Sequence, residues 1–84
     1  MTPSTITAEA IRSRVFAALE ELGADPAKLS LDAGFEALDV DSLDLVELGQ
    51  IVHEEYGVEL KGADIANLRT VGDAVALVAE RAGA

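Results

Sequence analysis

The chain has 84 residues, half of them hydrophobic, and a formal net charge of -10 at pH 7. A chain of this length supports only one hydrophobic core. Because only two phenylalanines and one tyrosine are aromatic, aliphatic side chains must fill that core. The negative charge repels nucleic acid phosphates and anionic membranes, so it excludes both as partners and favours proteins with basic surfaces.

The sequence contains no cysteine, which excludes disulfides, thiolate metal sites and a cysteine nucleophile. The first seven residues lack a basic segment followed by an apolar run, and no apolar stretch approaches the roughly 18 residues of a membrane span. We therefore expect a cytoplasmic protein. It is also expected to be a monomer and to have no metal site, other than at most a weak acidic site for divalent cations. Residues 1–84, with their own Met1, are expected to form a single stand-alone domain.

Residues 8–22 are expected to form the first amphipathic helix. Thr7 is a suitable N-cap, and Gly23 followed by Asp25-Pro26 ends the helix. Apolar side chains recur with helical spacing at Ile11, Val15, Ala18, Leu19 and Leu22.

Residues 23–41 lose this period and contain Pro26 and Gly34, which predicts a long loop. Long ordered loops in compact domains often carry function. The loop is expected to touch the core at intervals through Leu29, Leu31, Phe35 and Leu38.

A second helix is predicted over 42–56, ended by Gly57. Residues 58–60 alternate like a strand but are too few and lack a partner, so they are expected to form a connector. The side chains of the second helix that face the core are Leu45, Leu48, Val52 and Tyr56.

A short helix is predicted over 62–68 and a last helix over 70–82, with Thr70 as N-cap and Asp73 at the capping-box position. The pattern is all-α: a small four-helix bundle of three longer helices and one short helix. The last helix places Val71, Val75, Val78 and Ala82 on one side.

The segment 35–44 brings a serine, Ser42, from the long loop to the start of the second helix. N–H groups in the first turn of a helix have no partner within the helix and lie at the positive end of its dipole. A phosphodiester on Ser42 would therefore be favoured there, despite Asp41 and Asp44. The alternative is that this Asp-Ser pair only caps the helix.

The outward face of the second helix is unusually apolar for a surface. Leu43 and Val46 lie opposite the core stripe, among Glu47, Gln50 and Glu54. Exposed apolar side chains among acidic ones are typical of a surface that binds another protein.

Over nearly the whole chain these features resemble the acyl carrier protein family, in which a Phe, a Leu and an Asp-Ser-Leu precede acidic and apolar positions. The matching positions are Phe35, Leu38, Asp41, Ser42, Leu43, Val46, Glu47 and Glu54. The resemblance implies a four-helix bundle of acyl carrier type. It also implies a phosphoprotein in which Ser42, flanked by Asp41 and Leu43, carries 4'-phosphopantetheine from coenzyme A.

The resemblance further implies that a phosphopantetheinyl transferase attaches this arm and that its thiol holds acyl intermediates as thioesters. The partners would be a ketosynthase, an acyltransferase or other acyl-processing enzymes with basic patches. The chain itself would not be an enzyme, since Ser42 lacks a Gly-x-Ser-x-Gly elbow and His53 is three helical turns away. The expected docking residues are Asp44, Val46, Glu47, Gln50, His53 and Glu54.

Three positions depart from the family. Asp39 stands where Gly is common, so a different backbone conformation or an added negative contact is expected there. Gln50 stands where fatty acid carriers often have Met, and His53 where they often have an acid. Gln50 and His53 weaken an assignment to primary fatty acid biosynthesis, although His53 is expected to be a solvated surface residue. The stretch Tyr56-Gly57-Val58 and a tail rich in Gly, Ala and Val look more like bacterial polyketide carriers, which favours polyketide or another specialised biosynthesis.

Other functions fit the sequence less well. A calcium loop starting at Asp39 would place Asp44 where Gly is needed and Gln50 where a bidentate Glu is needed. A peptidyl carrier, which would load an amino acid, commonly has Gly-Gly where this chain has Asp39-Val40. The remaining alternative is a non-catalytic interaction module whose Ser42 serves only as an N-cap.

Overall fold

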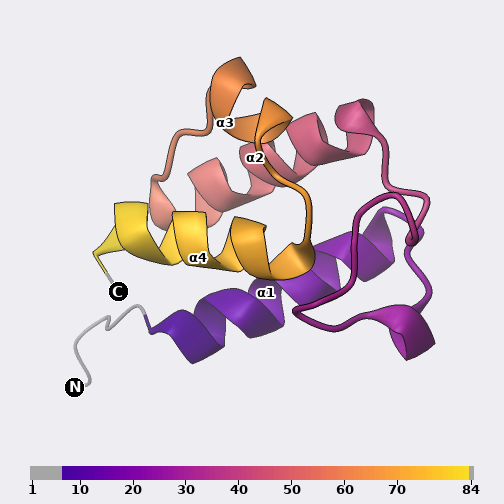
Figure 1. Ribbon diagram of the computed structural model, residues 1–84. Coiled ribbons are helices and arrows are strands. Elements are labelled where there is room, and N and C mark those ends of the chain that lie inside the picture. Colours follow the sequence, from indigo (N-terminus) through magenta and orange to yellow (C-terminus); the bar gives the residue numbers. More distant parts are fainter. Residues whose placement is uncertain (1–6, 84) are drawn as a thin grey trace.

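This computed structural model describes residues 7–83. They form four α-helices and one 3-10 turn joined by loops, and this part of the chain contains no strand. Three longer helices and one short helix surround one core (Figure 1). The predicted all-α class is confirmed. In chain order the elements are α1 (Ala8–Glu21), the 3-10 turn η1 (Pro26–Lys28), α2 (Ser42–Tyr56), α3 (Gly62–Ala66) and α4 (Val71–Ala82).

The helices begin where side chains satisfy their free N–H groups. Thr7 caps α1, since its Oγ1 accepts from the Ala10 N–H at 3.0 Å. Thr70 caps α4 in a capping box, because the Asp73 N–H donates to Thr70 Oγ1 at 3.1 Å and the Thr70 N–H to Asp73 Oδ2 at 3.2 Å. Gly57, with φ 70°, ends α2 in the left-handed conformation that glycine adopts without strain.

The core is a single cluster, aliphatic apart from Phe35, to which the three longer helices and the loops contribute. Helix α1 packs against α4 and α2, and α3 packs against α2 (Figure 1). This aliphatic filling agrees with the small number of aromatic residues. The largest fully buried side chains are Ile11, Val15, Leu19, Leu48, Val52, Val71 and Val78.

Some predicted boundaries and contacts differ from those observed. Helix α1 ends at Glu21, α3 ends at Ala66, and Thr70 lies outside α4 as its cap. The turn η1 was expected to be loop; it forms because Asp25 Oδ1 accepts from the Ala27 N–H at 2.9 Å. The predicted core contact of Leu31 is wrong, because this residue is 41% exposed.

Backbone hydrogen bonds join the long loop to the start of α4. The Val71 N–H donates to the Ala33 carbonyl at 3.0 Å, and the Phe35 N–H donates to the Arg69 carbonyl at 3.0 Å. The Gly72 N–H donates to the Leu31 carbonyl at 2.8 Å. This junction holds the second half of the loop against the bundle, at the end of the molecule where α2 begins (Figure 1).

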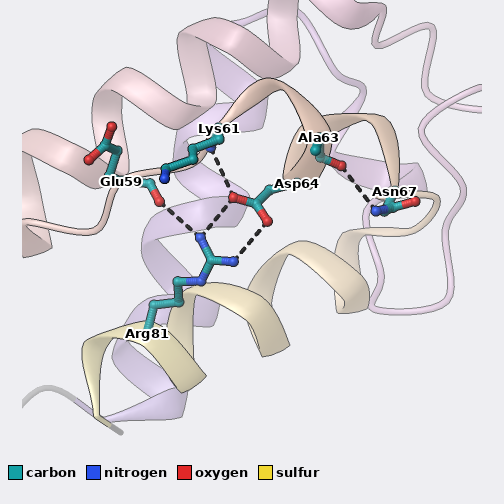
Figure 2. Close-up of polar contacts among 6 residues, drawn as sticks. All are labelled: Glu59, Lys61, Ala63, Asp64, Asn67 and Arg81. Atoms are coloured by element: carbon teal, nitrogen blue, oxygen red, sulfur yellow. Dashed lines mark hydrogen bonds and ion pairs between the residues drawn. The ribbon is translucent and has the colours of Figure 1, made fainter.

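A salt bridge joins α3 to the last turn of α4. Figure 2 shows the Arg81 guanidinium donating to both carboxylate oxygens of Asp64, each at 2.8 Å, and to the Glu59 carbonyl at 3.1 Å. Asp64 Oδ2 also accepts from the Lys61 N–H at 3.0 Å. Asp64 therefore completes the first turn of α3 and connects this short helix to α4.

The Asp64–Arg81 pair is expected to make stability depend on pH between about 4 and about 2. The hydrogen bond from Arg81, and then that from the Lys61 backbone, lowers the pKa of Asp64 from 3.8 to about 2. The pair's stabilisation is thus complete above pH 4 and disappears as the pH falls through 2. Urea denaturation of the wild type and Asp64→Asn should show a difference in unfolding free energy that shrinks across this window. A difference that stays constant would contradict the assignment.

Candidate functional site

A tight turn at residues 34–40 leads the loop into α2. The Val40 N–H donates to the Phe35 carbonyl at 2.9 Å, and the Asp39 N–H donates to the Glu36 carbonyl at 3.1 Å. This pairing is the Schellman arrangement, with buried Phe35 and Val40 at its two ends. Asp39 takes the left-handed position with φ 57°. Glycine would adopt this backbone conformation without strain. Asp39 makes the turn less stable, because the left-handed conformation is unfavourable for a residue with a Cβ.

Replacing Asp39 by glycine is expected to stabilise the protein by up to about 1 kcal/mol. Left-handed backbone costs a residue with a Cβ roughly 1 kcal/mol or more, partly offset by the greater unfolded-state entropy of glycine. Thermal unfolding of Asp39→Gly, Asp39→Asn and Asp39→Ala separates the effect of the backbone conformation on stability from the effect of the side-chain charge. Asn removes only the charge and tolerates this conformation, whereas Ala is expected to destabilise. Equal melting temperatures for Asp39→Gly and Asp39→Ala would contradict the proposed backbone strain at this position.

The N-cap of α2 is Asp41, and Ser42 is the first residue of the helix. The Asp44 N–H donates to Asp41 Oδ1 at 2.9 Å, and the Asp41 N–H donates to Asp44 Oδ2 at 3.3 Å. These reciprocal bonds form a capping box built from two aspartates. The interpretation of Ser42 as the N-cap is therefore wrong, and its exposed side chain is not used for capping.

An anion on Ser42 would experience both attraction and repulsion. The N-terminal end of α2 favours an anion through its dipole and its first-turn N–H groups. In the capping box, the carboxylates of Asp41 and Asp44 already accept hydrogen bonds from backbone N–H groups at this helix end. An anion attached to the Ser42 hydroxyl would therefore meet the helix end on one side and two carboxylates nearby.

The outward face of α2 is exposed along its length. Leu43 is 67% exposed and Val46 is 43% exposed, two of the three large hydrophobic side chains on the surface of the described chain. Asp44 is half-buried because it belongs to the capping box. The surface formed by Leu43 and the exposed residues predicted to dock is called the docking face, after the role that the sequence predicts for it. Its other exposed members are Glu47, Gln50, His53 and Glu54.

The structure also brings to this end of the molecule residues that the sequence did not single out. Glu36 and Arg69 line a hollow beside Val40 and Leu45, which lie on either side of Ser42 in the chain. No local pattern connects position 36 with position 69, so only the folded chain shows their proximity. Within residues 7–83, no group of three or more His, Asp or Glu side chains is arranged to hold a metal ion.

Comparisons with known proteins agree with this geometry. Residues 15–78 match the family model described as the phosphopantetheine attachment site. An acyl carrier protein of Rhodococcus erythropolis is 39% identical over 74 residues, covering 86% of this chain and 81% of that protein. The chain belongs to the acyl carrier protein family. Members of this family carry a covalently attached 4'-phosphopantetheine and act as non-catalytic carriers for acyl-processing enzymes.

Further relatives and a solved structure are consistent with membership of the acyl carrier protein family. An acyl carrier protein of Phenylobacterium zucineum is 43% identical over 67 residues, covering 79% of this chain and 85% of that protein. The meromycolate extension acyl carrier protein of Mycobacterium tuberculosis is 37% identical over 75 residues, covering 87% of this chain but 65% of that longer protein.

The crystal structure of an acyl carrier protein from Thermotoga maritima shares the fold. Its TM-score is 0.69 at 22% identity, over 84% of this chain and 89% of that one. Among the helices that the structure describes, none has the length and apolar character needed to cross a bilayer.

Proposed function

We propose that Ser42 is the residue that carries 4'-phosphopantetheine in this acyl carrier protein and that the arm's thiol holds acyl intermediates as thioesters. A separate phosphopantetheinyl transferase would supply the arm from coenzyme A. The arm would raise the effective concentration of its cargo at each enzyme that the carrier visits. The chain would act as one carrier domain without catalysing a reaction itself.

The division of roles between Asp41 and Ser42 carries this proposal. Asp41 provides the cap of α2, so the neighbouring hydroxyl is exposed and has no capping duty. The first turn offers N–H groups and a positive dipole end to the phosphodiester that would form on this hydroxyl. The arm itself would supply the thiol chemistry that a chain without cysteine lacks.

Peptide mapping after modification tests the position of the arm. The protein is incubated with coenzyme A and a transferase of broad specificity, digested and analysed by mass spectrometry. One phosphopantetheine is expected, on the peptide that contains Ser42. The exposed hydroxyls of Ser13 and Ser30 serve as internal controls. An arm on either of these, or no arm at all, would contradict the proposal.

We further propose that the docking face binds the transferase and the acyl-processing enzymes, including a ketosynthase or an acyltransferase. Acidic side chains around the exposed Leu43 and Val46 match a partner surface with a basic rim and an apolar centre. Complementary charge would speed the encounter, and apolar contact would hold the complex. The protein would meet these partners as a monomer.

Reversing a charge on the docking face is expected to slow arm transfer roughly tenfold at low salt, because electrostatic attraction accelerates association. Glu47→Lys tests this, and the same reversal at the exposed Glu20 of α1 is the matched control. Initial rates of modification should differ between the variants, and the difference should shrink as salt screens the charges. Equal rates at low salt would argue against a role for this face in docking.

The cargo is proposed to be an acyl chain of polyketide or fatty acid type. Gln50 and His53, where fatty acid carriers often have Met and an acid, favour a specialised pathway. The relative named for meromycolate extension is compatible with acyl chain extension. A peptidyl carrier role would predict an aminoacyl thioester instead. Mass spectrometry of the loaded arm on protein from its native host distinguishes the two.

A further inference from the structure

A hollow of about 450 Å³ opens between the turn that precedes α2 and the segment that enters α4. Its volume lies within the range of roughly 300–1,000 Å³ that is typical of small-molecule sites. Phe35, Val40, Leu45 and Leu68 form its apolar walls. Because Val40 and Leu45 lie on either side of Ser42 in the chain, a group tethered at Ser42 starts next to this hollow.

The charged residues of the hollow are Arg69 and Glu36, both exposed at its edge. In the part of the chain that the structure describes, the ion pairs are those of Arg14 and Arg81, so Arg69 pairs with no carboxylate there. Arg12, Lys28 and Lys61 are likewise in no ion pair there, and Arg69 differs from them in lining this hollow. An Arg without a carboxylate partner beside an apolar hollow offers a planar set of donors for carboxylate or phosphate.

The backbone keeps Arg69 at this edge. Its carbonyl accepts from the Phe35 N–H at 3.0 Å, and its own N–H donates to Asp73 Oδ2 at 3.1 Å. The residue is therefore held between the loop and the first turn of α4, while its guanidinium remains available. Close to Ser42, where Asp41 and Asp44 add negative charge, such a cation would offset the repulsion that an incoming anion meets.

We propose that Arg69 binds an anionic group of the arm attached at Ser42, with the neighbouring part of the arm or cargo in the hollow. This inference rests on the proposed attachment to Ser42. The anion is either the phosphodiester at Ser42 or a carboxylate at the end of the cargo. In both cases Arg69 donates hydrogen bonds to anionic oxygens, and Glu36 on the same edge weakens the interaction.

Nuclear magnetic resonance of the Arg69 side chain tests the proposal. The Nε–H signal is assigned by its loss in Arg69→Gln and compared in four forms: without the arm, with the free arm, with an acetyl arm and with a malonyl arm. Pairing is expected to shift this signal and to slow its exchange with water about tenfold, as for a charge-assisted hydrogen bond. Intact mass first confirms that each arm is attached.

The pattern across the four forms identifies the anion. Equal changes in all three arm-bearing forms assign the phosphodiester, and a change only in the malonyl form assigns a cargo carboxylate. Glu36→Gln should enlarge the effect. If the arm binds Arg69, its attachment should raise the melting temperature, and Arg69→Lys should keep part of this increase because it keeps the positive charge. An Arg69 signal unchanged in every correctly loaded form would overturn the pairing alone. Failure of the mass to increase would overturn both proposals.

Discussion

Replacing Ser42 by alanine is expected to abolish phosphopantetheine addition completely while changing the free energy of unfolding by no more than about 0.5 kcal/mol. The modification needs the hydroxyl, whereas the helix does not, because Asp41 supplies the cap of α2. Intact mass after incubation with coenzyme A and transferase measures the first effect. Urea denaturation measures the second.

Asp41→Ala is the matched variant, with the opposite expected result. Loss of an N-cap side chain costs about 1 kcal/mol, although the variant retains the hydroxyl that accepts the arm. Prolonged incubation should therefore still add one arm to Asp41→Ala. If Ser42→Ala lost as much stability as Asp41→Ala, Ser42 would have a capping role that the structure does not show. An arm on Ser42→Ala would place the attachment elsewhere.

Replacing Gly72 by alanine is expected to destabilise the protein by about 1–3 kcal/mol, the usual cost of forcing an atom into a packed site. A Cβ at this position would lie 2.8 Å from the Leu31 carbonyl oxygen, the atom that accepts the Gly72 N–H. The backbone of the loop would have to move, since no flexible side chain can yield instead. The gain of at most about 1 kcal/mol from the higher helix propensity of alanine does not offset this cost.

Gly62→Ala is the control for this substitution. A Cβ at Gly62, the first residue of α3, has no atom within 4 Å, so alanine there should be neutral or stabilising. Hydrogen exchange adds a local measurement: in Gly72→Ala the amides of Phe35 and Val71, which form the junction between loop and α4, should exchange faster. A Gly72→Ala variant as stable as Gly62→Ala would show that the close approach to Leu31 is not required.

Much of the fold was predictable because its signals are local. The 3.6-residue period of apolar side chains located α1, α2 and α4, and Thr7 and Thr70 marked two helix starts that the structure confirms. Less was predictable in residues 23–41, where no period exists. There the exposure of Leu31 and the turn η1 depend on contacts that a short sequence window does not contain.

In the candidate site, too, the sequence predicted some features and not others. Leu43 and Val46 were expected on the outer face of the second helix, and both are exposed, because helical spacing alone sets the face of a residue. The choice between Asp41 and Ser42 as cap was not predictable, since both residue types are good N-caps. It depends on the backbone at Asp41, which is extended with φ -94° and ψ -178°.

By itself, the sequence determined an acidic all-α chain with a serine at the start of its second helix and an apolar stripe beside it. Only the tertiary structure decided that Asp41 caps this helix, that Gly72 meets Leu31, that Arg69 borders a hollow near Ser42 and that Arg81 binds Asp64. The physical reason is the range of the interactions. Periodicity and capping act over a few neighbouring residues, whereas these contacts join segments that approach one another only when the common core forms.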